Sequence, residues 1–308
     1  MDKYRAFQKR VINLYIEHPE VKRIWSMLDK RRKYRMMGIE EDTDETPMHL
    51  FIKGKSRVGK TQMMKKYQKH AAGYVYTEHD GTEVDIVPVA YMELPSPFTL
   101  VGFYSQIITM GLNAPPIKGS PKVYDLERRA FELLKRQKVE MLIIDEMDYL
   151  LASTYVNTKQ AMEQIKKVAN MTNVCLVCVG TPAIESLRKL NDQHIGRYAP
   201  TDIPWFKTCN EDFFELLEDI ENQLASEVPI GLSDRNSALP YMLHELSGGL
   251  IGWLKPILRE TFDLLGVFEP NFKDFTVLTK IDGDILIQAR ENVIGQLSEK
   301  EINDFLER

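Results

Sequence analysis

The sequence predicts an α/β fold, with a parallel five-stranded sheet covered by helices on both faces and followed by a small helical lid. The first indication is the succession of strand, glycine-rich loop and helix across residues 48–70. Second, apolar runs alternate with amphipathic segments as far as Phe206, which is typical of a parallel sheet. Third, only helical periodicity recurs from Glu211 to Gln296, which predicts the lid.

Five apolar runs are the expected strands. Val174–Gly180 is continuously apolar, as a central parallel strand requires. Pro88 places its strand near an edge, because proline has no N–H for the ladder. The strands are expected at Met48–Lys53, Val84–Met92, Val139–Glu146, Val174–Gly180 and Thr201–Phe206. Helices are expected at Thr61–His70, Leu100–Gly111, Lys122–Gln137, Asn157–Met171, Glu211–Glu227, Ala238–Leu246, Leu250–Leu265 and Ile281–Ile294.

These elements divide the chain into four expected parts. Residues 1–45 form an N-terminal helical and basic segment, and residues 46–208 form the α/β core. Residues 209–296 form the helical lid, whose first helix carries seven acids and no bases over 211–227. The last stretch, 297–308, is expected to be a tail, either a separate short helix or frayed.

The charge distribution limits the kind of partner. A net charge of −5 argues against a surface that attracts nucleic acid everywhere. Residues 1–35 are nevertheless basic, with eleven Lys/Arg against four Asp/Glu, and end in the run Lys30–Arg35; the run Glu40–Glu45 then reverses the sign. A solvated helix with an acidic loop explains this pattern, and so does a local phosphate-binding patch; both readings stay open.

Cysteine content and hydropathy indicate a cytoplasmic protein without a membrane segment. No run approaches the ~18 continuous apolar residues of a membrane span, and the N-terminus lacks the apolar core of a signal peptide. Three cysteines argue against a disulfide scaffold. Cys175 and Cys178 are three apart on one expected strand and point to opposite faces, so we interpret them as core residues.

The chemistry centres on the loop Gly54–Thr61, which fits the phosphate-binding P-loop pattern. Backbone N–H groups of Ser56, Arg57 and Val58 are expected to surround phosphate oxygens, with Gly54 and Gly59 allowing the turn. Lys60 is expected to reach the β- and γ-phosphates, and the Thr61 hydroxyl to bind Mg²⁺. The loop therefore predicts ATP and Mg²⁺ as cofactors.

Two acids at the end of the third expected strand point to hydrolysis. Asp145 is expected to hold Mg²⁺, and Glu146 to polarise the attacking water as general base. An apolar strand delivers both carboxylates to the carboxyl edge of the sheet, where open α/β sheets bind ligands.

Two further residues are candidates for the same site. Thr181 follows the fourth expected strand; if that strand lies between those of the P-loop and Asp145, Thr181 senses the γ-phosphate. It is also placed to cap a helix before Pro182. Arg197 precedes the fifth strand, either as a surface residue or as an arginine finger supplied to a neighbouring subunit.

With these motifs in place, the chain resembles the TniB/TnsC family of AAA+ ATPases, which regulate transposition. The resemblance rests on Gly54–Thr61, Met141–Glu146 and Val179–Thr181, with flanking likeness at Ile24–Lys33 and Gly248–Glu260. It implies a P-loop AAA+ core and an ATP-dependent homo-oligomer, ring or filament, on double-stranded DNA. It further implies that the protein links a target-selection protein, TniQ-like, to a transposase and hydrolyses ATP to control disassembly.

The resemblance also assigns roles to residues. Arg197 matches the arginine-finger segment of the family, and the Lys30–Arg35 run matches a region near the nucleotide base. The loops Ser96–Thr99 and Asn113–Lys122 match segments that contact the DNA backbone, with Lys118 and Lys122 the main candidates and Ser96 and Thr99 the weaker ones. Such backbone contacts carry little sequence information.

The lid departs from the AAA+ pattern. Where a sensor arginine is often found, this chain has the segment Gly252–Lys255. Lys255 or Arg259 substitutes for it, or the lid does not contact phosphate and Trp253 is a core residue.

Two alternative functions share this core. One is a helicase-loader or replication-initiator ATPase, and the other is an ATP-dependent protein scaffold that does not bind DNA. The acidic helix Glu211–Glu227 disfavours DNA contact on its own face and leaves that face to a protein.

Overall fold

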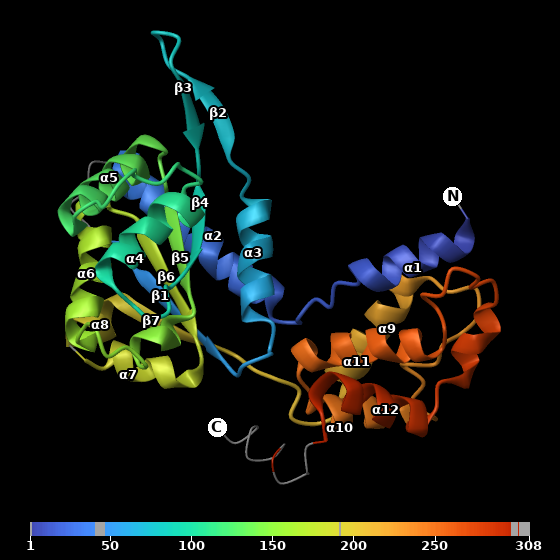
Figure 1. Ribbon diagram of the computed structural model, residues 1–308. Coiled ribbons are helices and arrows are strands. Elements are labelled where there is room, and N and C mark those ends of the chain that lie inside the picture. The colour runs from blue at the N-terminus through green and yellow to red at the C-terminus, as the bar shows by residue number, and fades with distance from the viewer. Residues whose placement is uncertain (1, 41–46, 191, 297–300, 302–308) are drawn as a thin grey trace. The chain divides into compact units, whose positions relative to one another are not determined.

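The computed structural model describes residues 2–40, 47–190, 192–296 and 301 (Figure 1). The chain divides into two compact units. The α/β unit consists of Lys22–Gly54 and Lys60–Ile203, and the helical unit of Met1–Val21, Lys55–Gly59 and Pro204–Arg308. Residues 41–45 of the expected acidic loop lie outside the described residues. The expected tail, 297–308, also lies outside them, apart from residue 301. The four linear parts expected from the sequence remain a prediction.

The α/β unit is built on a five-stranded sheet with the order β4-β5-β6-β1-β7. All of its neighbouring strands run parallel, which confirms the predicted sheet. The strands are β1 (His49–Gly54), β4 (Val89–Glu93), β5 (Met141–Asp145), β6 (Cys175–Gly180) and β7 (Tyr198–Ile203). The register pairs Glu93 with Asp145 and Lys53 with Gly180. These pairs bring the ends of β1, β4, β5 and β6 to one edge of the sheet.

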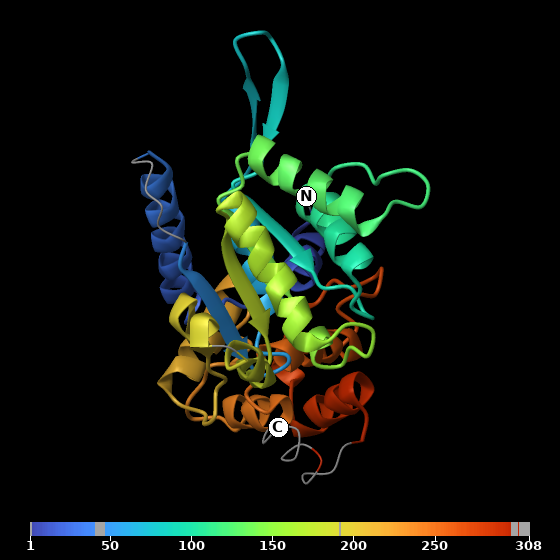
Figure 2. The ribbon, with the colours of Figure 1, turned by 90° about the vertical axis from the view of Figure 1, so that its left-hand side faces the viewer.

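The core of this unit lies between the sheet and two layers of helices. Every residue of β5 and β6 is buried, because both strands are central and covered on both faces. Figures 1 and 2 show α4, α5 and α6 on one face and α2 with α3 on the other. The helical segments are α2 (Val21–Glu40), α3 (Lys60–His70), α4 (Leu100–Gln106) with its π-helical continuation η1 (Ile107–Gly111), α5 (Val123–Arg136), η2 (Met147–Leu150), α6 (Thr158–Thr172), η3 (Pro182–Ile184), α7 (Glu185–Arg188) and α8 (Asp192–Arg197).

The cysteines of β6 are core residues, as predicted. Cys175 and Cys178 are both free and fully buried. Burial raises the pKa of Cys175 to about 12 and that of Cys178 well above its ordinary value. Both thiols therefore stay protonated and unreactive at neutral pH.

The prediction of one strand across Val84–Met92 is wrong. Pro88 interrupts it, and the chain forms two strands instead, β3 (Glu83–Ile86) and β4. β3 pairs antiparallel with β2 (Tyr74–Thr77), which the sequence analysis did not foresee, and Figure 1 shows this hairpin projecting from the α/β unit. The Pro88 carbonyl accepts hydrogen bonds from Glu140 and Met141, so the break ties the start of β4 to the start of β5. The last strand, β7, begins at Tyr198 rather than at Thr201.

The helical unit gathers helices from both ends of the chain. They are α1 (Lys3–Asn13), α9 (Glu211–Leu224), α10 (Leu239–Ser247), α11 (Ile251–Leu264), the 3₁₀ segment η4 (Phe275–Lys280) and α12 (Gly283–Ile294). The acidic helix α9 buries its apolar stripe, including Phe213 and Leu217, as its periodicity predicted. Trp253 of α11 is also a buried residue. No helix in the described part of the chain has the length and apolarity needed to cross a membrane.

An aromatic cluster joins α1 to the rest of the helical unit. The fully buried ring of Phe7 lies 6.0 Å from that of Phe262 and 5.4 Å from that of Phe275, edge to face in both pairs. Phe272 completes the cluster. Aromatic pairs at such distances stabilise a fold beyond the area that they bury.

We therefore expect the substitution Phe7→Ala to destabilise the helical unit by about 3–5 kcal/mol, because it leaves a cavity among aromatic rings. Urea unfolding monitored by circular dichroism measures the effect. Ile12→Ala is the matched control, since Ile12 lies on the same helix and its side chain is half exposed; it should change the free energy of unfolding by less than about 0.5 kcal/mol. Equal effects of the two substitutions would contradict the assignment of Phe7 as the anchor of α1.

Candidate functional site

Asp145 is the hub of the site in the α/β unit. It ends β5, is 1% exposed, and accepts hydrogen bonds on Oδ2 from the Thr61 hydroxyl at 2.7 Å and the Tyr91 hydroxyl at 2.9 Å. Thr61 lies in the first turn of α3, directly after Lys60. The structure thus brings together the two residues, Thr61 and Asp145, that the sequence analysis expected to share a metal ion.

Tyr91 extends this contact into a chain of polar groups. Its hydroxyl also lies 3.1 Å from the Glu93 carboxylate, which pairs with Lys65 of α3 at 2.9 Å. Burial raises the pKa of Tyr91 far above its ordinary value, and the nearby Asp145 charge raises it further. The phenol therefore stays a hydrogen-bond donor, and its single proton is shared between two carboxylates.

Lys60 lies at the base of the loop that carries the P-loop motif. Its Nζ donates to the Gly54 carbonyl at 2.6 Å. Burial lowers the pKa of Lys60, while the negative charges of Asp145 and Asp148 act in the opposite direction. A half-buried ammonium beside carboxylates is suited to hold an anionic ligand at this point.

Glu146 has a backbone conformation that few non-glycine residues adopt. Its φ of 57° and ψ of 41° lie in the left-handed region. Burial raises the pKa of its carboxyl, and the Asp145 charge raises it further. Such strain and such a shift both occur preferentially at functional sites, and a raised pKa makes this carboxylate a stronger base.

The rest of the P-loop, Lys55–Gly59, belongs to the helical unit. Val58 is buried, while Ser56 and Arg57 are exposed. Gly59 has a φ of 104°, a conformation that requires glycine, and Arg57 has a φ of 68°. Lys55 Nζ lies 4.6 Å from the centre of the Trp205 ring, which lines a pocket of about 250 Å³ together with His18 and Lys207.

Thr181 follows β6, which does lie between β1 and β5, as the sensor hypothesis requires. Its backbone N–H donates to Asp148 at 2.8 Å, and its hydroxyl also bonds to that carboxylate. The same hydroxyl accepts from the Ala183 N–H at 3.3 Å, which is the predicted cap. Gly180 permits this approach, because a Cβ there would lie 2.6 Å from Asp148 Oδ2.

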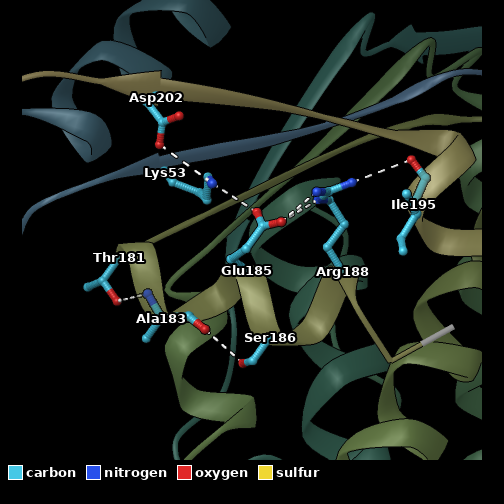
Figure 3. Close-up of polar contacts among 8 residues, drawn as sticks. All are labelled: Lys53, Thr181, Ala183, Glu185, Ser186, Arg188, Ile195 and Asp202. Carbon is cyan, nitrogen blue, oxygen red and sulfur yellow. Dashed lines mark hydrogen bonds and ion pairs between the residues drawn. The ribbon is translucent and has the colours of Figure 1, made fainter. Parts of the chain in front are cut away.

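Figure 3 shows a cluster of charges beside Thr181. Lys53, the residue before Gly54, lies between Glu185 at 2.8 Å and Asp202 at 3.6 Å. The hydrogen bond from Arg188 and that from Lys53 lower the pKa of Glu185 to about 2. Arg188 also donates to the Ile195 carbonyl of α8 at 3.5 Å, so it links α7 to the helix that ends at Arg197.

Arg197 itself lies apart from this cluster. It ends α8, is partly exposed, and makes a long hydrogen bond of 3.5 Å to Asn170 of α6. Arg188, in contrast, is bound to Glu185. Of these two arginines, Arg197 is therefore the more weakly held.

The four DNA-contact candidates lie in two places. Ser96 is exposed, whereas the Thr99 hydroxyl caps α4 by accepting from the Gly102 N–H at 3.0 Å. Lys118 and Lys122 are both exposed in the loop that precedes α5. The helical segment 100–111 lies between the two places in the sequence.

The basic run of α2 is largely bound to its own unit. Arg32 pairs with Glu140 at 2.7 Å, and Arg35 donates to the Asn173 carbonyl. Lys30 and Lys33 remain exposed. The run therefore holds α2 against the residues just before β5 and β6, in addition to adding surface charge.

Lys255 and Arg259, the two cations expected in the lid, lie together on α11. They line a pocket of about 450 Å³ within the helical unit, with acidic Glu260 and Asp263 also at its wall. Burial lowers the pKa of Lys255, and the neighbouring Arg259 charge lowers it further.

Sequence reasoning missed Tyr91, Asp148 and Trp205. Tyr91 lies in an apolar strand, and nothing in the sequence distinguishes a tyrosine there from a core residue. Asp148 follows Asp145 by three residues, and this short spacing between two acids is the feature of the sequence that could have identified Asp148. Trp205 could not be identified from the sequence, because no local pattern shows that the Lys55 ammonium lies over its ring.

Comparison of the fold with solved structures finds proteins named ORC1, ORC2 and Cdc6p. The ORC2 protein of Aeropyrum pernix, solved as ADPNP–ADP complexes, is 14% identical, with a TM-score of 0.56 over 97% of this chain and 88% of that one. The ORC1 protein of the same organism, solved in complex with DNA, is 15% identical, with a TM-score of 0.59 over 92% and 68%. Cdc6p of Pyrobaculum aerophilum is 12% identical, with a TM-score of 0.53 over 97% and 88%. At these identities the likeness shows the fold alone.

The sequence itself matches a family model. No curated protein matches the chain. The model described as bacterial TniB protein matches residues 12–208, which is more than half of the chain and includes the P-loop, Asp145 and Arg197. The chain therefore belongs to the TniB family and has the fold of an AAA+ ATPase.

Proposed function

We propose that this protein is an ATP-dependent, DNA-binding regulator of transposition. It assembles as a homo-oligomer on duplex DNA, connects a TniQ-like target-selection protein to the transposase, and hydrolyses ATP to control disassembly. Family membership supports the process, and the contact of Thr61 with Asp145 supports the nucleotide chemistry. Its expected compartment is the cytoplasm, where such DNA is found.

The ATP site is proposed from the residues that converge at the end of β5. Thr61 and Asp145 offer a hydroxyl and a carboxylate, the oxygen ligands that Mg²⁺ prefers, so these residues fit the ion. When bound, Mg²⁺ neutralises charge on the phosphates. Lys60 holds the β- and γ-phosphates, and the N–H groups of the loop Ser56–Gly59 surround them. The Tyr91 hydroxyl orients Asp145.

Hydrolysis is proposed to need two carboxylates and an arginine. Asp145 accepts two hydrogen bonds, which hold its carboxylate in place. Glu146, with its raised pKa, takes the proton of the attacking water. Thr181, held by Asp148, is proposed to contact the γ-phosphate. Arg197 completes the pocket of a neighbouring subunit, where it stabilises transition-state charge.

The DNA contact is proposed to be electrostatic and not sequence-specific. Lys118 and Lys122 are exposed cations on one loop and bind phosphates. Ser96 and Thr99 add weaker contacts; the Thr99 hydroxyl caps α4 as an acceptor and can still donate its proton to a phosphate oxygen. A regulator that follows a mark laid by another protein has no need of base readout.

A replication-initiator or helicase-loader role is the main alternative. The archaeal ORC proteins share the fold, yet at 14–15% identity that likeness does not carry their function. The family match favours transposition. Preferential capture of a helicase over a transposase in the presence of ATP would favour the alternative.

The substitution Lys60→Ala should lower ATP affinity by about 10- to 100-fold, because it removes a charged contact to phosphate. It should also abolish ATP-dependent assembly on duplex DNA, seen by electron microscopy.

The double variant Lys118→Ala/Lys122→Ala should keep wild-type ATP affinity and lose DNA binding, with a shallower salt dependence of any binding that remains. Normal assembly by Lys60→Ala would contradict the proposal, and DNA-independent assembly by the wild type would favour a scaffold.

The substitution Tyr91→Phe should raise the Mg²⁺ concentration needed for half-maximal nucleotide binding by roughly tenfold, because Asp145 loses a charge-assisted hydrogen bond. Titration of Mg²⁺ against a fluorescent ATP analogue measures it. Tyr124→Phe is the control, since that side chain is exposed. An unchanged Mg²⁺ requirement in Tyr91→Phe would mean that Thr61 alone orients Asp145.

Glu146→Gln and Arg197→Ala should each bind ATP and hydrolyse it at least about 100-fold more slowly than the wild type. Mixed at equal amounts, they should recover about a quarter of the wild-type rate, because some interfaces then pair an intact Glu146 with an intact Arg197. No recovery would place Arg197 outside the neighbouring pocket.

The proposed base, Glu146, acts when deprotonated, and the pKa of its carboxyl is raised. The wild-type rate of ATP hydrolysis should therefore fall as the pH drops through a value above 4.5.

A further inference from the structure

The first turn of α11 lies against the P-loop within the helical unit. The Gly252 N–H donates to the Arg57 carbonyl at 2.7 Å. Gly252 is the second residue of α11, so its N–H is one of the four at a helix start that have no partner inside the helix. The N-cap residue, Leu250, has no side chain that accepts such a bond. The Arg57 carbonyl therefore takes the place of a capping side chain.

The approach is close enough to require glycine at position 252. A Cβ there would lie 2.6 Å from the Arg57 carbonyl oxygen and 2.9 Å from both Cα and Cβ of Arg57. Two of these three atoms are backbone, so no rotation of a side chain relieves the overlap. The φ of Gly252 is not in the left-handed region, and the contact is therefore what excludes a side chain.

This hydrogen bond also determines the direction of an N–H group in the P-loop. In a trans peptide the carbonyl and the following N–H point in opposite directions. Holding the Arg57 carbonyl on α11 therefore turns the Val58 N–H away from that helix. In this structure the Val58 N–H lies 3.3 Å from the Lys55 carbonyl, a long hydrogen bond that is easily exchanged for a stronger acceptor. Arg57 keeps a left-handed φ of 68° in the same turn.

We propose that Gly252 is a positioning residue for ATP: it links the lid to the P-loop through the backbone. Its N–H holds the Arg57–Val58 peptide so that the Val58 N–H points away from α11, where a phosphate can replace the Lys55 carbonyl as its acceptor. This inference rests on the proposed ATP binding and answers how a lid without the usual arginine responds to nucleotide. Binding of ATP strengthens the contact and orders the first turn of α11, and the lid in turn raises ATP affinity.

The test compares Gly252→Ala with Gly283→Ala. Gly283 begins α12 in the same unit, and its added Cβ would meet only the flexible end of Met242. Gly252→Ala should weaken binding of a fluorescent ATP analogue by about tenfold, as expected for loss of one hydrogen bond with displacement of the loop. It should raise KM for ATP with little change in kcat. Gly283→Ala should bind ATP within about twofold of the wild type.

A second measurement uses the wild-type protein, in case Gly252→Ala does not fold. Hydrogen exchange of residues 251–254 should slow when ATP is added. Wild-type ATP affinity in a folded Gly252→Ala variant, or exchange at 251–254 that ATP does not change, would overturn the inference. If the wild type binds no ATP at all, the proposed function fails instead, so the two failures are distinguishable.

Discussion

The site depends on the position of one buried carboxylate. Asp145 lies at the end of a fully buried strand and accepts hydrogen bonds from Thr61 of α3 and Tyr91 of β4. A carboxylate removed from water in this way is costly unless donors compensate it, so the three elements are held in one arrangement. The Lys65–Glu93 pair strengthens that arrangement by joining α3 to the end of β4. The metal binding expected at this edge of the sheet depends on this arrangement of Asp145, Thr61 and Tyr91.

A second feature is that the P-loop is shared between the two compact units. Lys60 and Thr61 begin a helix of the α/β unit, whereas Lys55–Gly59 has its contacts in the helical unit. The contact of Gly252 with Arg57 and that of Lys55 with Trp205 both lie in the helical unit.

Particular residues show how far sequence reasoning reaches. The P-loop and the strand that ends in Asp145 are both predictable, because each is a local pattern whose spacing reflects a local geometry. The lid helices are predictable from periodicity, and α11 begins within one residue of its expected start. The hairpin β2–β3 was missed because its two strands are short, and β2 is exposed along its length without an alternating pattern. Thr99 was expected as a DNA contact and stays a prediction; that its hydroxyl also caps α4 is seen only in the structure.

The sequence by itself determined the fold class, the loop with the P-loop pattern and the acids at the strand end, because these depend on residue type and on spacing along the chain. Only the tertiary structure decided that Tyr91 shares its proton between Asp145 and Glu93, that Asp148 holds Thr181, and that Gly252 supports Arg57. Apart from the contact of Tyr91 with Glu93, which are two positions apart, these contacts join residues 33 to 195 positions apart. Which distant residues meet is set by strand order and helix packing, and no local pattern contains that information.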